Sequence, residues 1–347
     1  MRFKLVYITL YPEKYPRVRK IAVALKDEDV AFQALTPRIR VKLGSRQVER
    51  IVSAVITYAS YLLQIFFSRA DVYWVANSPD IFVVPLVVKR ANYILDYRGP
   101  WPLEVELEFG KGTLSRVALF LTRTALKNAG ALSLTTSTLE KDVKGFGKKV
   151  YVIPNYPLKS SFKPNVSSAQ FRKKNNVKEG QKVILFTGKL SVVEGFDILP
   201  SIAEKLVSRN GDIMFWIVGD GLLRPLALAL EKKFPRNVKF FGWCPYQEIP
   251  NFVNAADVCV VPRHKTSFSD YYNEEGVHKI SEYMFFRKPI VACGIASSKE
   301  YLLVELQDMA NGILQALAGK VPKPTPRTWE DDCKEKVLEV VDFAKKL

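Results

Sequence analysis

The sequence predicts an α/β protein with two Rossmann-like domains that face a central cleft. Short runs of β-branched and aromatic residues alternate with longer helical patterns, which is typical of parallel sheets built from strand–helix–strand units. Two such series are present, and a segment rich in Pro, Asn, Ser and Lys separates them. The length of 347 residues suits two domains of ordinary size.

Six strands are expected in the first series, at residues 4–10, 30–34, 72–76, 93–96, 131–135 and 149–153. Several are apolar on both faces, as strands covered by helices on both sides must be. The opening "MRFKLVYITLYP" has too short an apolar part for a signal peptide, so we assign it to the first strand. Residues 51–67 carry no charge, which is at the lower limit for a membrane span. Because they include Ser, Thr, Tyr and Gln, we predict a helix packed on the sheet.

Five strands are expected in the second series, at residues 182–187, 213–218, 238–241, 258–261 and 289–292. We place the domain boundary after Pro157, which gives domains of residues 1–157 and 158–347. A last amphipathic helix, at about residues 329–347, follows the Pro-rich "VPKPTPR". This helix is a candidate to pack back on the N-terminal domain.

The composition limits which partners the protein is expected to bind and in which cellular compartment it is expected to lie. The net charge is +17, with +11 in residues 1–157 and +6 in the remainder. Such a charge fits lipid headgroups, nucleic acid or a phosphorylated substrate, and it equally fits a lysine-rich soluble surface. No nucleic-acid-reading motif is present, so nucleic acid is not expected as a partner. Four cysteines without a CxxC pair, and only two histidines, disfavour a zinc site and a disulfide framework, so a cytoplasmic location is favoured.

Glycines and charges follow the strands of the second series. Ligands of open parallel sheets bind at the carboxyl ends of the strands, so these loops are the first place to expect a site. Gly188 and Lys189 follow the first strand, Asp220 and Gly221 the second, and Arg263 the fourth. Gly188 permits close backbone approach, and Lys189 supplies a fixed cation.

The stretch "NEEGVHKISEYM" predicts a loop that runs into a helix. Gly276 ends the loop, and the helix is expected over residues 277–286, with the amides of Gly276 and Val277 facing the cleft. With Lys279 and the other cations, these amides predict a diphosphate site. Glu282, within the helix, can accept two hydrogen bonds from a sugar diol. Phosphates together with a ribose diol indicate a nucleotide.

Several nucleotide-binding motifs are missing from the sequence. No GxGxxG fingerprint follows the first strand of either series, which disfavours NAD, and no Walker A motif exists, which disfavours an NTPase. No DxD-like pair closes a strand in a way that demands a metal. We therefore expect no metal and no cofactor.

In their order, several segments resemble the GT-B glycosyltransferases, and within them the large retaining group that includes sucrose- and glycogen-synthase-like enzymes (family 4-like, glycosyl transferases group 1). The resemblance covers most of the chain. It rests on "YPRVRKIAVALK", "VYVIPNYP", "LFTGKLSVVEGFDIL", "WIVGDGLL", "VKFFGWCPYQEIPNFVNAADVCVVPR" and "EEGVHKISEYMFFRKPIVAC".

The resemblance implies a nucleotide-sugar donor held by the C-terminal domain, an acceptor held by the N-terminal domain, and a metal-independent transfer with retention of configuration. It implies that Glu282 holds the ribose hydroxyls and that Lys189 binds the diphosphate. It further implies that Glu274 contacts the donor sugar, although a shift of one residue would give that role to Glu275. The leaving phosphate would accept the acceptor's proton, so no protein nucleophile is needed.

Some residues depart from the family pattern. Glu194 stands where the family has a second basic residue, so the phosphates have less support unless Arg263 or Lys279 substitutes. Asn77 stands where many members have histidine, and it could bind a sugar but not act as a base. Asp96 and Arg98 end a strand of the acceptor domain, where they either form an ion pair or contact a substrate.

The sequence thus predicts a retaining glycosyltransferase at the cytoplasmic face of a membrane, acting on a lipid-linked or polysaccharide acceptor. A cluster of basic residues precedes the apolar helix of residues 51–67, and it is either a solvated loop or a docking patch for anionic lipid. The cluster consists of Arg38, Arg40, Lys42, Arg46 and Arg50. A GT-B sugar-nucleotide epimerase and a non-catalytic nucleotide-sugar-binding subunit remain as alternatives.

Overall fold

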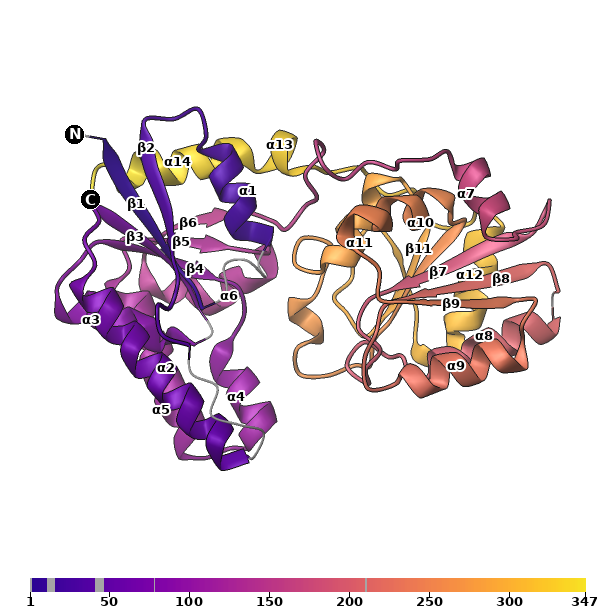
Figure 1. Cartoon of the computed structure of the whole chain (residues 1–347), viewed down its shortest axis with the longest axis horizontal. Coiled ribbons are helices and arrows are strands. Elements are labelled where there is room, and N and C mark those ends of the chain that lie inside the picture. The colour runs from indigo at the N-terminus through magenta and orange to yellow at the C-terminus, as the bar shows by residue number, and fades with distance from the viewer. Residues whose placement is uncertain (1, 11–15, 41–46, 78, 210) are drawn as a thin grey trace. The chain divides into compact units, whose positions relative to one another are not determined.

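The computed structural model describes residues 2–10, 16–40, 47–77, 79–209 and 211–347, and the chain forms two compact units. The N-terminal unit is Met1–Pro154 together with Asp332–Leu347, and the C-terminal unit is Asn155–Asp331. Each unit contains one six-stranded parallel sheet with helices on both faces (Figure 1). The predicted α/β class with two Rossmann-like domains is confirmed.

The sheet of the N-terminal unit has the strand order β2-β1-β3-β4-β5-β6. Its strands are β1 (Phe3–Ile8), β2 (Val30–Leu35), β3 (Val72–Ala76), β4 (Tyr93–Tyr97), β5 (Ala131–Leu134) and β6 (Lys149–Val152). Its helices are α1 (Pro16–Ala24), α2 (Gln47–Phe67), α3 (Val84–Val88), α4 (Trp101–Phe109), α5 (Thr113–Asn128), α6 (Glu140–Val143) and α14 (Lys334–Ala344). β3 and β4 are buried at every position because α1 and α14 cover one face of the sheet, and α2, α3 and α5 cover the other (Figure 1).

The end of the chain belongs to the N-terminal unit. After the C-terminal unit, the chain returns and α14 packs against α1, β5 and β6. Val337, Val340 and Val341 fill this contact. The boundary between the units lies at Pro154, close to the expected position after Pro157.

The uncharged segment of residues 51–67 lies within α2. Among the helices of the described residues, none combines the length and the hydropathy that a membrane span requires. α2 is anchored by Tyr61, whose hydroxyl lies 2.6 Å from the carbonyl oxygen of Leu35. Lys89 closes the carboxyl end of the helix, since its ammonium donates to the carbonyl oxygens of Ile65 (2.8 Å) and Ser68 (2.9 Å).

The sheet of the C-terminal unit has the order β12-β11-β10-β7-β8-β9. Its strands are β7 (Lys182–Thr187), β8 (Ile213–Val218), β9 (Val238–Gly242), β10 (Val258–Pro262), β11 (Ile290–Cys293) and β12 (Leu302–Leu303). The short β12 was not predicted. The helices are α7 (Ser168–Lys174), α8 (Leu199–Arg209), α9 (Arg224–Lys233), α10 (Ile249–Ala255), α11 (His278–Phe285), α12 (Met309–Leu317) and α13 (Trp329–Asp332).

Two apolar layers enclose this second sheet. α8, α9 and α12 pack on one face, around Phe186 and Phe215, and α7, α10 and α11 pack on the other, around Trp216 (Figure 1). The chain runs outward from the central β7 through β8 and β9, and then returns to place β10 on the other side of β7. The strand order therefore reverses between β7 and β10, where open α/β sheets bind ligands.

Candidate functional site

A cavity of about 410 Å³ lies at the carboxyl ends of β7 and β10, in the C-terminal unit. Its lining residues come from four segments of the chain: Thr187, Gly188, Lys189, Glu194, Ile249, Arg263, Tyr272, Gly276, Val277, His278, Lys279 and Glu282. Seven of these were predicted as site residues, namely Gly188, Lys189, Arg263, Gly276, Val277, Lys279 and Glu282. The fold thus brings together residues that are up to 94 positions apart in the sequence.

A buried tyrosine of α11 fixes this helix beside the end of β7. The Thr187 backbone N–H donates to the Tyr283 hydroxyl at 3.0 Å, and the two hydroxyl groups lie 2.8 Å apart. Tyr283 is fully buried. The end of β7, which leads into the loop of Lys189, and the second turn of α11 are therefore held together by side chains of the core.

Glycines let the loops of the cavity lie directly on one another. Gly195 has φ +69°, and a Cβ there would lie 1.3 Å from the carbonyl oxygen of Pro262. Gly219 has φ +139°, and its Cβ would lie 1.8 Å from the carbonyl oxygen of Gly188. Side chains are excluded at both positions, and the first contact brings Glu194 beside Arg263.

Three cations and two acids line the cavity, and one of the acids, Glu194, pairs with two of the cations. Lys279 pairs with Glu194 at 2.7 Å, and Arg263 pairs with the same carboxylate at 3.4 Å. The Arg263 guanidinium also stacks on Tyr272, 3.9 Å from the ring centre. Lys189 is exposed at the mouth of the cavity. Glu194, which replaces a basic residue of the family pattern, is therefore a partner of the two buried cations.

Burial and ion pairing have opposite effects on the pKa of Glu194 and on the pKa of Lys279. Burial alone would raise the pKa of Glu194, but Lys279 and Arg263 more than offset it, so the pKa of Glu194 lies below its ordinary value. Burial lowers the pKa of Lys279, and Glu194 offsets part of that change. The carboxylate of Glu194 is thus held ionised by the two cations.

Glu282 lines the cavity from α11 and is 7% exposed. The Tyr246 hydroxyl hydrogen-bonds to it, and burial, followed by the charge of Glu282, raises the pKa of Tyr246. An ionised carboxylate is a hydrogen-bond acceptor with several acceptor sites, which is the type of group that suits ligand hydroxyls. Tyr246 was not predicted, and its only sequence signal was its position after the third strand of the series.

The amides of Gly276 and Val277 are already used within the loop, contrary to expectation. The Gly276 N–H donates to Asn273 Oδ1 at 3.2 Å, and the Val277 N–H donates to the Asn273 carbonyl oxygen at 2.9 Å. Asn273 was not predicted to matter. It shapes the loop before α11, so the two residues line the cavity without offering those amides to a phosphate.

Glu274 and Glu275 are absent from the residues that line the cavity. Glu274 lies near Ser298, which hydrogen-bonds to its carboxylate, and burial raises the pKa of Glu274 above its ordinary value. Glu275 lies near Asn273, whose amide donates to it at 3.5 Å, and its carbonyl oxygen accepts from the Asn155 N–H at 2.9 Å. The role of either acid in contacting a donor sugar stays a prediction.

Asp220 and Gly221 are also absent from the lining residues. The Asp220 carboxylate accepts from the Gly221 N–H at 2.8 Å and lies 3.8 Å from Arg224, one turn along the chain. The Asp220 carbonyl oxygen accepts from the Leu190 N–H at 2.9 Å. These contacts give the two residues a structural role in the loops behind the cavity.

The predicted residues of the N-terminal unit hold its loops in place. Asp96 is fully buried, pairs with Arg17 at 2.8 Å, and accepts hydrogen bonds from Tyr7 and Ser133. The expectation that Asp96 contacts a substrate is therefore corrected, because none of its surface is exposed and Arg17 is its ion-pair partner.

Asn77 and Arg98 form a second buried connection in this unit. Asn77 is fully buried and donates to the Gly99 carbonyl oxygen at 2.7 Å. Its side-chain oxygen accepts from the Arg98 N–H at 2.7 Å, and the Arg98 guanidinium donates to the Asn77 carbonyl oxygen at 3.1 Å. The expected sugar contact of Asn77 is corrected likewise: its side chain orders the loop after β4.

Candidate metal ligands do not gather in the described residues, where no group of three or more His, Cys, Asp and Glu side chains has a metal-binding arrangement. His264 instead pairs with Asp197 at 2.8 Å. Of the basic cluster before α2, Lys42 and Arg46 lie outside the described residues, as does the side chain of Arg50, while Arg38 and Arg40 are exposed.

The sequence of the C-terminal unit matches a known family. Residues 167–314 match the model described as "Glycosyl transferases group 1". The match covers 148 of the 347 residues. All residues that line the cavity lie within the matched range.

A distant relative and several solved structures resemble the chain. A 2-deoxystreptamine N-acetyl-D-glucosaminyltransferase of Niallia circulans is 24% identical over 94 residues, which cover 26% of this chain and only 23% of that protein. A sucrose-phosphate synthase of Thermosynechococcus elongatus has a TM-score of 0.69 at 16% identity, covering 99% of this chain and 97% of that one. Anabaena HepE in complex with UDP-glucose has a TM-score of 0.65 at 15% identity, covering 99% and 100%. These likenesses show the GT-B fold.

Proposed function

We propose that this protein is a metal-independent, retaining glycosyltransferase that moves a sugar from a nucleotide-sugar to a saccharide or lipid-linked acceptor. The cavity within residues 167–314 carries this proposal, because the buried acid Glu282 lies there among Lys189, Arg263 and Lys279. Anabaena HepE, which shares the fold, has been crystallised with UDP and with UDP-glucose. A uridine diphosphate sugar is therefore the first donor to test.

Each group of the cavity has a distinct part in donor binding. Glu282 accepts hydrogen bonds from the ribose hydroxyls, because an ionised carboxylate is an acceptor that can take several hydrogen bonds. Lys189 is exposed at the cavity mouth and contacts the diphosphate directly, while Lys279 and Arg263 add positive potential from the wall. Glu274 or Glu275 contacts the sugar once the donor is bound.

The chemistry follows from the charge that develops on the diphosphate. The bond between the anomeric carbon and the phosphate oxygen breaks, and the acceptor oxygen bonds to the same face of the sugar. The acceptor's proton passes to the leaving phosphate oxygen. Lys189 stabilises the phosphate most when this bond breaks, which is how a fixed cation accelerates the step.

The N-terminal unit holds the acceptor in this proposal, and the reaction takes place in the cytoplasm, with peripheral contact to an anionic membrane. All four cysteines are free, which suits a reducing compartment. The excess of positive charge in residues 1–157 favours an acceptor that carries phosphate or lies in an anionic membrane.

Calorimetry with UDP and with inorganic diphosphate tests the proposed site. Glu282→Gln is expected to weaken UDP binding about 10- to 100-fold, because hydrogen bonds to an ionised acceptor are lost, and to leave inorganic diphosphate unaffected. Lys189→Ala is expected to weaken both ligands. Glu179→Gln, at an exposed acid of the same unit, is the matched control. Equal UDP affinity of Glu282→Gln and wild type would refute the ribose assignment.

Turnover separates the proposed transferase from its alternatives. A donor panel is incubated with saccharide and lipid-linked acceptors, and the products are resolved by mass spectrometry and by NMR of the anomeric proton. Transfer with retained configuration supports the proposal. Release of epimerised sugar points to an epimerase, and UDP binding without turnover of any donor points to a non-catalytic binding subunit.

A further inference from the structure

Helix α2 has the opposite polarity from that of an ordinary surface helix. Among its described residues, the buried side chains are Ser53, Thr57, Tyr61 and Ile65, of which only Ile65 is fully apolar. Its exposed side chains are mostly large and apolar: Val52, Val55, Ile56, Leu63, Phe66 and Phe67. We call these six residues the α2 stripe. Since amphipathic helices of globular proteins turn their apolar face inward, the stripe indicates an apolar partner outside the described chain.

The α2 stripe is a single continuous face. At about 100° per residue, its six positions fall within an arc of about 120°, and they extend about 23 Å along the helix. Phe67 is 75% exposed and Leu63 is 60% exposed. Val84 and Val88 of α3, which contacts α2, are also exposed. The surface is broader than the isolated apolar residues that soluble proteins commonly expose.

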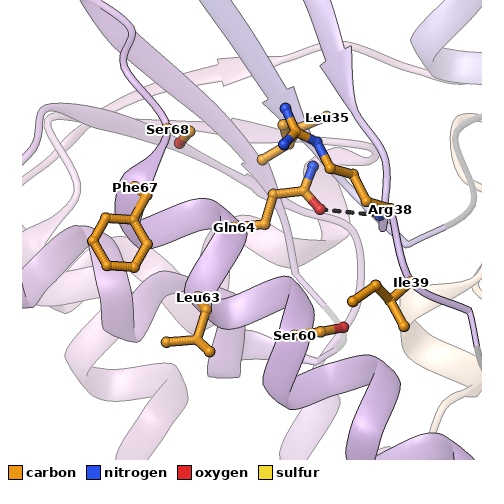
Figure 2. A pocket seen from close by; sticks show the side chains of 8 residues that line it. All are labelled: Leu35, Arg38, Ile39, Ser60, Leu63, Gln64, Phe67 and Ser68. Atoms are coloured by element: carbon orange, nitrogen blue, oxygen red, sulfur yellow. Dashed lines mark hydrogen bonds between the residues drawn. The ribbon is translucent and has the colours of Figure 1, made fainter.

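An apolar groove of about 400 Å³ runs beside the α2 stripe, between α2 and the segment after β2. Figure 2 shows Leu63 and Phe67 projecting from the helix, with Arg38 and Ile39 on the segment across from Gln64. Gln64 fixes this segment, because it accepts from the Arg38 N–H at 3.1 Å and donates to the Thr36 carbonyl oxygen at 2.8 Å. The groove is thus a formed feature with a cation at its rim.

The charges around the stripe favour an anionic partner. Residues 36–70 contain six Lys and Arg and one acid, Glu49. Arg38 lines the groove and is exposed, Arg40 is exposed two residues further on, and Arg69 is exposed after the end of α2. The stripe itself carries no charge. An apolar helix face bordered by cations matches the boundary between the headgroups and acyl chains of an anionic bilayer.

We propose that the α2 stripe docks on an anionic phospholipid bilayer, with the helix in the plane of the interface, Arg38 at the headgroups and one acyl chain in the groove. The inference rests on the membrane contact of the proposed function, and it names the surface that makes this contact. It does not depend on the sugar or the nucleotide, because all of its residues belong to the N-terminal unit.

Flotation with phospholipid vesicles tests the docking surface. Wild type is expected to bind vesicles of phosphatidylglycerol and phosphatidylcholine, to bind pure phosphatidylcholine weakly, and to lose affinity as salt rises. For the variant Leu63→Gln with Phe67→Gln, the partition coefficient onto the anionic vesicles is expected to fall at least about tenfold, because both apolar anchors are removed. Arg38→Glu is expected to bind less tightly than wild type at low salt.

The matched control is Leu226→Gln with Leu228→Gln, two exposed leucines on α9 of the other unit, which are expected to leave vesicle binding unchanged. Circular dichroism and UDP calorimetry check that each variant is folded. Failure of the wild type to bind anionic vesicles would overturn the proposal, and so would equal binding by the wild type and the Leu63→Gln with Phe67→Gln variant. A wild-type dimer that this variant dissociates, with no vesicle binding by either protein, would also overturn it. Loss of UDP binding alone would count against the transferase and not against this surface.

Discussion

Glu194 places a negative charge beside two of the three cations that line the candidate cavity. It pairs with Lys279 at 2.7 Å and with Arg263 at 3.4 Å, and all three side chains are largely buried. A diphosphate entering the cavity has to share these cations with the carboxylate. Removing the charge should therefore strengthen the binding of anions in proportion to the charge of the ligand.

Glu194→Gln is expected to bind UDP about three- to tenfold more tightly than wild type, because a competing charge is removed from a partly buried site. Uridine, which lacks phosphate, should bind as before. Calorimetry at low and high salt measures both. Asp220→Asn, which removes an exposed acid outside the cavity lining, is the control and should change little. Weaker UDP binding by Glu194→Gln would mean that Glu194 chiefly positions its two cations.

Asp96→Ala is expected to destabilise the protein by about 3–5 kcal/mol, because the buried guanidinium of Arg17 loses its partner. Burial would raise the pKa of Asp96, but Arg17 more than offsets it, so the carboxylate stays ionised in the folded chain. Urea unfolding measures the loss. The double variant Arg17→Met with Asp96→Leu is expected to recover much of it, since no charge is then buried alone. Equal losses in both variants would contradict this account.

The residues of the site show what a sequence can predict. The seven predicted lining residues follow strands of one parallel sheet, and such loops gather at one edge whatever their detailed course. The amides of Gly276 and Val277 were mispredicted because their partner, Asn273, depends on how the loop folds. The Arg17 partner of Asp96 lies 79 residues away and depends on the strand order around β1, which alternation alone does not reveal.

At the scale of elements, the strands were predictable, but which face of α2 is buried was not. Apolar runs such as those of β3 and β4 have one interpretation in a covered sheet. The uncharged residues of α2 predict a helix in contact with apolar surroundings. They do not specify whether the sheet or another partner provides those surroundings, and the structure leaves the more apolar face exposed.

Asp80 connects two elements and makes their packing depend on pH. It is buried at the start of the short 3-10 helix Asp80–Val83, where Thr122 of α5 donates to it. Burial raises the pKa of Asp80 to about 6, from 3.8. The folded state therefore binds a proton more tightly than the unfolded state, and stability is lost as pH rises from about 4 through about 6.

Asp80→Asn is expected to stabilise the protein by about 1–3 kcal/mol at pH 7.5 and to have little effect near pH 4, because the neutral amide avoids the cost of burying a charge. Urea midpoints between pH 4 and pH 8 measure the difference. The exposed Asp29→Asn serves as the control and should give no such profile. A benefit of Asp80→Asn that does not change with pH would contradict the assignment.

At the scale of the whole molecule, the chain builds its N-terminal unit from both ends. Residues up to Pro154 make the sheet, and α14 completes one of its faces after the chain has formed the C-terminal unit. A terminal amphipathic helix after a Pro-rich segment is evident from the sequence. Its docking surface is not, because an apolar helix face fits the open face of either sheet.

Val340→Ala tests this division of the chain. Val340 is fully buried, and α14 contacts β5 and β6, so losing two methyl groups is expected to destabilise the N-terminal unit by about 1–3 kcal/mol. Hydrogen exchange measured by mass spectrometry should then become faster in residues 131–152 and stay unchanged in residues 182–218. Val166→Ala, at an exposed valine, should change neither region. Faster exchange in both regions would mean that the two units unfold together, since the lost packing lies in only one of them.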